Sequence, residues 1–244
     1  MVPKRLAILG DSWAHGEWSF VGDSNVVTHP GLSYFLYQKY PDVEIVNFAI
    51  NGGRNLYQLD KLKEFDISNF DAVIVFWTDP GRDVINELVE NPIDRGKLTE
   101  LIYKNKCKRY TLNNLDGLQK LGIPVLMIGG HVSLPDQVND EKYTNITPVI
   151  DRMTNLIKHP FWSIEHMTHA QGTVHNQIDW KALTRWGGKG FTELFWKDVQ
   201  RLSKVDDPML NLEYFNDLGH ANRKLHEIAS VKIIEQLNNA SNLS

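Results

Sequence analysis

The sequence predicts an α/β protein, a three-layer α/β/α sandwich around a central, mostly parallel sheet. Short runs that are apolar on both faces recur along the chain, as buried parallel strands do. Longer amphipathic segments separate these runs, which is the order that right-handed βαβ crossovers require. In such a fold, ligands bind at the carboxyl ends of the strands, so we expect the functional residues there.

The elements follow one another in βαβ order. Apolar runs predict strands at 5–10 (RLAILG), 43–49 (VEIVNFA), 71–78 (DAVIVFWT) and 123–130 (IPVLMIGG). Amphipathic segments predict helices over about 31–40, 55–65 and 97–121, and from about residue 221 onward. Gly122 and Pro124 form a helix stop followed by a strand start. Parallel strands and crossover helices thus account for the first half of the chain.

The pattern weakens after His131. We interpret 132–208 as an elaboration within a single domain, 1–244, because no Ser/Gly/Pro-rich linker divides the chain. The stretch 159–196 holds four of the seven Trp and four of the nine His. The Trp residues either pack within this elaboration or form a platform for a sugar or acyl chain.

Composition restricts the partners. With 26 basic and 30 acidic side chains and no long basic run, the chain lacks the footprint of a nucleic-acid-binding protein. No apolar run approaches the roughly 18 residues of a membrane span. The start MVPKRLAILG does not read as a signal peptide, so we expect a cytoplasmic protein. The single cysteine, Cys107, excludes an intrachain disulfide. Small-molecule partners are favoured.

Polar residues cluster where the predicted strands end. Strand one ends at Gly10-Asp11-Ser12, strand two runs into Asn51-Gly52-Gly53, strand three ends at Trp77-Thr78-Asp79, and NDLGHAN (216–222) precedes the last helix. Because the carboxyl ends of parallel strands meet at one edge of the sheet, we expect these stretches to converge. Gly10-Asp11-Ser12 alone is also typical of an ordinary turn, and Gly22-Asp23-Ser24 repeats it.

Together, these stretches resemble the SGNH, or GDSL-type, hydrolases, serine esterases on a flavodoxin-like sheet whose motifs occur in this order. The resemblance implies that Ser12 is the nucleophile and that Asp217 and His220 match the Asp-x-x-His of the family. It favours Ser12 over Ser24, because only Ser12 follows a strand-like run at the beginning of the chain. At this spacing Asp217 can orient one ring nitrogen of His220 while the other takes the proton of Ser12.

The resemblance also implies an oxyanion hole. Its expected donors are the backbone N–H of Ser12 and that of Gly52, which aligns with the glycine of the second motif block; Gly53 is a near-equal alternative. The third donor of the family is an asparagine in a G-x-N-D stretch, and Thr78 stands at that position here. Thr78 is therefore a candidate donor, with Asn51 or Asn55 as substitutes.

Residues flanking these positions predict the substrate pocket. We expect Trp13, Trp77 and Asp79 to line it, because they neighbour Ser12 and Thr78 in the sequence. We expect neither a cofactor nor a metal. The histidines at 166, 169 and 175 suggest a zinc site, but no nearby carboxylate or cysteine completes it convincingly, so we interpret them as exposed or core-edge histidines.

Three functions compete at this stage. The first is a serine ester hydrolase acting on an O-acyl ester, with the many aromatic residues favouring an O-acetylated glycan. The second is a non-catalytic glycan- or partner-binding module on the same fold, suggested by Thr78 in place of asparagine and by the Trp-rich stretch. The third is a flavodoxin-like nucleotide binder, which is disfavoured because neither G-x-G-x-x-G nor G-x-x-x-x-G-K-[ST] occurs.

Overall fold

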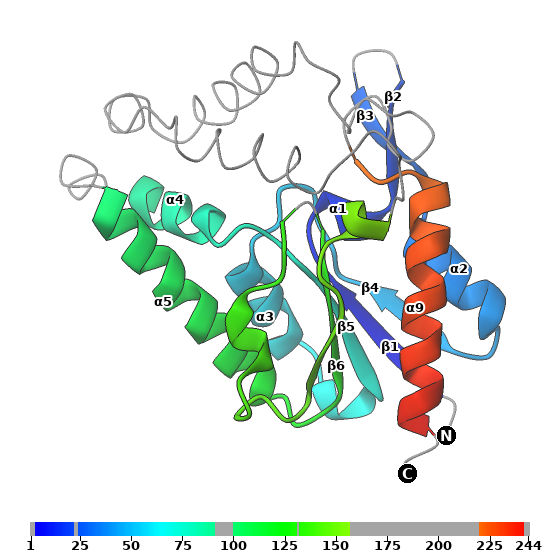
Figure 1. The fold of residues 1–244 in the computed structure, drawn as a ribbon. Helices are drawn as coiled ribbons and strands as arrows, with labels where there is room; N and C mark the ends of the chain where they lie inside the picture. The colour runs from blue at the N-terminus through cyan, green and yellow to red at the C-terminus, as the bar shows by residue number, and fades with distance from the viewer. Residues whose placement is uncertain (1–2, 22–23, 91–99, 131, 157–219, 242–244) are drawn as a thin grey trace.

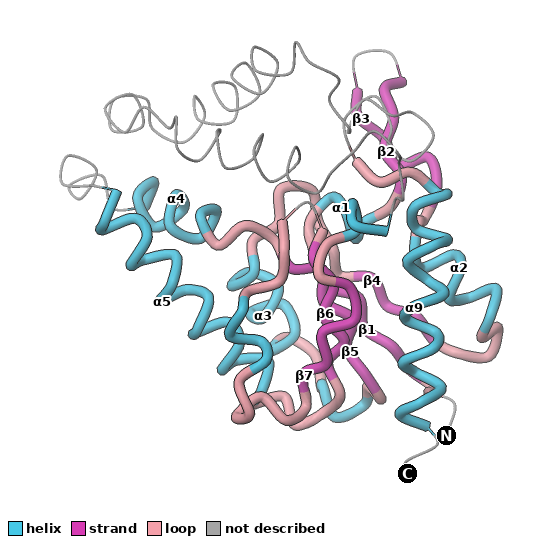
Figure 2. Tube along the Cα trace, viewed as in Figure 1, coloured by secondary structure: helices cyan, strands magenta, loops and turns pink. Residues whose placement is uncertain are grey.

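A five-stranded parallel sheet lies at the centre of the structure, a computed structural model that describes residues 3–21, 24–90, 100–130, 132–156 and 220–241. The strand order is β4-β1-β5-β6-β7. The strands are β1 (Arg5–Leu9), β4 (Glu44–Asn47), β5 (Ala72–Trp77), β6 (Val125–Gly129) and β7 (Ile146–Ile150). Figure 2 shows the strands running between two layers of helices. The predicted three-layer α/β/α class is confirmed.

Two helix layers cover the two faces of the sheet (Figure 1). One layer holds α2 (Leu32–Lys39) and α9 (Arg223–Ser241). The other holds α3 (Asn55–Lys63) and α5 (Glu100–Gln119), with α4 (Gly81–Glu90) packed on α5. Alternate residues of one strand point to opposite layers: Ile74 and Phe76 of β5 pack with α2 and α9, whereas Val73, Val75 and Trp77 pack with α3 and α5. This alternation explains why the strands are apolar on both faces.

Several elements differ from the prediction. The predicted strands and helices are present, but the helix α4 and the strand β7 were not predicted. The strand was missed because Thr147 is exposed and Pro148 interrupts the apolar pattern. Proline is tolerated there since β7 is an edge strand. Residues 146–150 therefore belong to the main sheet, although the sequence analysis assigned them to the 132–208 elaboration. The Trp- and His-rich stretch 159–196 lies outside the described residues.

A small hairpin follows strand β1. After the one-turn helix α1 (Ser12–His15), the chain forms β2 (Glu17–Val21) and β3 (Ser24–His29), an antiparallel pair separate from the main sheet. Ser24, the serine of the second Gly-Asp-Ser tripeptide, begins β3. Short helical turns η1 (Ile67–Asn69), η3 (Asp136–Asn139) and η4 (Met153–Leu156) complete the description. No helix in these described ranges is long and apolar enough to cross a membrane.

Candidate active site

Ser12 lies at the turn between β1 and α1. Asp11 caps the helix: its side chain accepts a hydrogen bond from Trp13 N (3.0 Å), and its carbonyl accepts from Ala14 N and His15 N (both 3.1 Å). A side chain at Gly10 would collide with Ala14 and Phe76. The turn therefore needs a glycine, and the Asp-Ser that follows it begins a helix, so Ser12 becomes the first helical residue.

His220 approaches this serine from the far end of the chain. Ser12 Oγ and His220 Nε2 are 2.7 Å apart, although 208 residues separate them in sequence. The imidazole lies between two indoles, with ring centroids 6.2 Å from Trp13 and 6.4 Å from Trp18. Trp18 also donates its indole N–H to the carbonyl of Ser12 (2.8 Å). The hairpin residue Trp18 thus contacts both partners, a contribution that the sequence analysis missed. Asp217 lies outside the described residues.

A tight turn over 50–53 lies beside the loop that carries Ser12. Gly53 N donates to Ile50 O (3.0 Å), and Ile50 N donates to Gly10 O (3.2 Å), which fixes the turn to the end of β1. Gly52 has φ +68°, a left-handed conformation that favours glycine. In the described part of the chain, the N–H groups of Ser12 and Gly52 have no acceptor, whereas that of Gly53 is already used. Of the two predicted glycines, Gly52 has the available donor.

Thr78 directly follows β5 and is completely buried. Its hydroxyl donates to Asp11 Oδ2 (2.9 Å), so its single proton is directed at that carboxylate. The side chain of Asn55 pairs with the main chain of Thr78: Asn55 Nδ2 donates to Thr78 O (2.7 Å), and Thr78 N donates to Asn55 Oδ1 (3.1 Å). Asn51 is exposed on the turn. Thr78 as a direct oxyanion donor stays a prediction.

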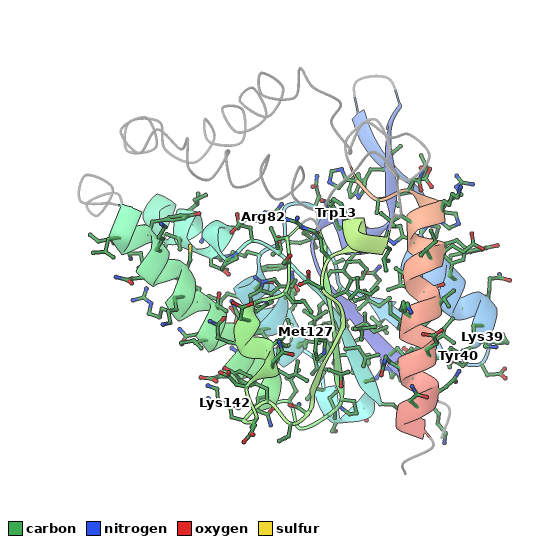
Figure 3. The ribbon with its side chains drawn as sticks, in the orientation of Figure 1. Trp13, Lys39, Tyr40, Arg82, Met127 and Lys142 are labelled. Atoms are coloured by element: carbon green, nitrogen blue, oxygen red, sulfur yellow. The ribbon has the colours of Figure 1, made fainter. Side chains whose placement is uncertain are left out.

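Arg82 makes two further hydrogen bonds to the residues around Ser12. Its Nη1 donates to Asp11 Oδ2 (2.7 Å) and to Gly53 O (3.0 Å). The side chain of Asp11 is 3% exposed and that of Arg82 is 33% exposed. Figure 3 shows Arg82 and Trp13 at the same end of the sheet. The sequence analysis did not single out Arg82. The one feature that could have indicated it is its place four residues after Thr78, at the start of a helix that follows a strand.

The other predicted pocket residues have structural partners. Trp13 and Trp77 are both buried, Trp13 in the core beneath α2 and α9 and Trp77 in the core beneath α3 and α5. Asp79 Oδ1 accepts from Gly81 N (2.8 Å) at the start of α4. These contacts explain the positions of the three side chains without a substrate, and their role in substrate binding stays a prediction.

Titratable groups gather where the hairpin meets α9. Glu17 Oε2 accepts from the backbone N (2.8 Å) and from Nε (3.0 Å) of Arg223. Partial burial of Glu17 opposes ionisation, but these hydrogen bonds prevail and lower its pKa. His226 is fully buried on α9, and burial lowers its pKa to about 4. On the other side of the sheet, burial raises the pKa of Asp83 to about 6.

We find no metal centre in the described ranges, where no three His, Cys, Asp or Glu side chains are grouped to hold an ion. The histidines at 166, 169 and 175 lie outside those ranges.

Fold and site together define an α/β/α protein with a serine–histidine pair at the carboxyl edge of a parallel sheet. No family model and no curated protein matches the sequence. Among solved structures, the chain is similar to a lipase/acylhydrolase from Enterococcus faecalis (TM-score 0.45, 14% identity, 97% of this chain and 96% of that chain). It is also similar to the psychrotrophic esterase EstA from Pseudoalteromonas sp. (TM-score 0.43, 12% identity, 98% and 99%).

Proposed function

We propose that the protein is a serine ester hydrolase of the SGNH type. The observation that carries the proposal is the 2.7 Å contact between Ser12 Oγ and His220 Nε2, formed across 208 residues at the edge of the sheet where ligands bind. A hydroxyl is a weak nucleophile until a neighbouring base removes its proton, and an imidazole at hydrogen-bond distance is the usual base. Asp217, three residues before His220, orients the imidazole in this proposal.

The reaction proceeds in two halves. His220 Nε2 takes the Ser12 proton as Oγ attacks the acyl carbon, and it returns that proton to the departing alcohol, leaving an acyl-enzyme on Ser12. A water molecule, deprotonated by His220, then attacks the acyl carbon, and Ser12 leaves with the proton. The products are a carboxylic acid and an alcohol.

The oxyanion of each tetrahedral intermediate needs donors. We assign this role to the N–H groups of Ser12 and Gly52, because both lack an acceptor in the described part of the chain and both belong to the loops beside Oγ. Thr78 supports the hole through Asp11, to which its hydroxyl donates. We propose an O-acyl ester as substrate, such as an O-acetylated glycan.

Labelling with a fluorophosphonate, read by peptide mass spectrometry, tests the nucleophile. We expect Ser12 to be labelled, and Ser12→Ala and His220→Ala each to lower kcat for an acetyl ester by about 10³-fold or more without additive effects. Ser24→Ala is the matched control, since it removes the serine of the second Gly-Asp-Ser and should keep full activity. Labelling of Ser24, or of no serine, would overturn the assignment and favour a binding module on this fold.

A further inference from the structure

Arg82, on helix α4, hydrogen-bonds two loops whose relative position matters for the proposed mechanism. One nitrogen, Nη1, donates both to the carboxylate of Asp11 (2.7 Å) and to the carbonyl of Gly53 (3.0 Å). Asp11 precedes the nucleophile, and Gly53 follows Gly52. Arg82 itself belongs to α4, so a third element fixes the separation of the first two.

Each end of this bridge controls one proposed oxyanion donor. Asp11 caps the first turn of α1 through Trp13 N, which sets the direction of the Ser12 N–H. Gly53 closes the 50–53 turn, which presents the Gly52 N–H. The opposite end of that turn is anchored by Ile50 N on Gly10 O (3.2 Å). Without Arg82, this segment would keep the Ile50–Gly10 bond and the Asn55–Thr78 pairing, and it would lose its link to Asp11.

We propose that Arg82 is a positioning residue that sets the spacing between the Ser12 and Gly52 donors. The inference rests on the proposed function. An asparagine amide from the end of β5 supplies a donor in the SGNH family, whereas here the Thr78 hydroxyl donates to Asp11. With the two backbone donors left to hold the oxyanion, their mutual distance decides how well it is stabilised. Arg82 does not touch the substrate in this proposal; it acts through Asp11 and Gly53.

This role makes a kinetic prediction that a general loss of stability does not. The negative charge on the substrate oxygen develops only in the transition state, so misplaced donors lower kcat while leaving KM nearly unchanged. The planar guanidinium also holds the two N–H groups of Nη1 in fixed directions, toward Asp11 and Gly53, whereas the N–H groups of an ammonium rotate freely. Arginine should therefore be replaceable by another guanidinium and poorly replaceable by lysine.

Arg82→Ala tests the inference through chemical rescue. We expect kcat for an acetyl ester to fall by about 10²-fold, the loss typical of one oxyanion donor, with KM within about threefold of wild type. Added ethylguanidinium should restore part of kcat, since the Arg82 side chain is one-third exposed and its site is accessible. Ethylammonium should restore less. Arg109→Ala is the matched control, because Arg109 lies on the surface of α5 and pairs there with Glu87 of α4. This variant should keep wild-type kcat.

The outcomes separate the two proposals. If the wild type neither hydrolyses esters nor is labelled at Ser12, the proposed function fails. If the wild type is active through Ser12 and Arg82→Ala keeps its kcat, or ethylammonium rescues as well as ethylguanidinium, the positioning role of Arg82 is wrong. If Arg82→Ala does not fold, Arg82→Lys decides: we expect a folded variant with kcat lowered about tenfold, and wild-type kcat would overturn the inference.

Discussion

The two sides of Ser12 are built from different interactions. On the proposed oxyanion side, hydrogen bonds of 2.7 to 3.0 Å join Asp11, Gly53, Thr78 and Arg82. The acceptors of these bonds are Asp11 Oδ2 and Gly53 O. These bonds are directional, and the Asp11 carboxylate at their centre is buried. Removing any donor leaves a buried charge less well solvated, so we expect this side to respond sharply to substitution.

On the histidine side, the described contacts include aromatic packing as well as hydrogen bonds. The indoles of Trp13 and Trp18 flank the His220 ring, and the Glu17–Arg223 pair joins the hairpin to the start of α9. Arg223 is largely exposed, and exposed ion pairs contribute little to stability. The comparison teaches that the proposed oxyanion donors are linked through one buried carboxylate, whereas the proposed base is flanked by two indoles.

Thr78→Val should show the larger effect, because it removes one donor from Asp11. We expect kcat to fall about tenfold, which corresponds to the lower end of the roughly 1.5–3 kcal/mol that one hydrogen bond to a charged group contributes, with KM unchanged. Thr78→Ser, which keeps the hydroxyl, is the control. Steady-state kinetics on one acetyl ester decide. A loss of 10² to 10³ would instead make the Thr78 hydroxyl a direct oxyanion donor, and an unchanged kcat would remove Thr78 from the site.

Glu17→Gln should have a smaller effect on the other side. We expect kcat to fall only about threefold, within the 0.2–1 kcal/mol that exposed ion pairs contribute. High salt should lower the wild-type kcat toward that of the variant, since salt screens the Glu17–Arg223 attraction. Glu64→Gln, in the exposed Lys61–Glu64 pair of α3, is the control and should change nothing. A tenfold loss that is insensitive to salt would show that the histidine side is as tightly fixed as the oxyanion side.

His226 should change the stability of the histidine side in acid and leave turnover at neutral pH unaffected. Its pKa is about 4 in the folded protein, against 6.5 for the unfolded chain, so the unfolded state binds more protons between these values. Stability is therefore full above pH 6.5 and falls by about 3 kcal/mol as the pH drops to 4. His29, Glu17 and His220 are the titratable groups whose charges act on His226.

His226→Leu removes this proton uptake. We expect its unfolding free energy, measured with urea from pH 7 to 4, to fall less than that of the wild type. His15→Gln is the control, because burial also lowers the pKa of His15 but its charge is not among those that act on His226, so the His226 contribution should stay in place. Parallel curves for the wild type and His226→Leu would contradict the assignment.

The sequence predicted the sheet better than the site. Strands β1, β5 and β6 were recognisable because burial on both faces leaves long apolar runs. The edge strand β4 is less buried but keeps the apolar pair Ile45-Val46, whereas Pro148 interrupts the edge strand β7. The pairing of Ser12 with His220 followed from motif order. The contact between Asp11 and Arg82 did not, because a hydrogen bond between residues 71 positions apart depends on how loops close and leaves no periodic trace.

The backbone nature of the proposed oxyanion donors has a practical consequence. Alanine scanning removes side chains, and the N–H groups of Ser12 and Gly52 survive it. A conventional scan would therefore find the nucleophile and the base, yet report the catalytic contribution of the 50–53 turn only through the strain of a Cβ at Gly52, whose φ is +68° and whose surroundings are open. The proposed contribution of this turn to catalysis would then be mistaken for a folding defect.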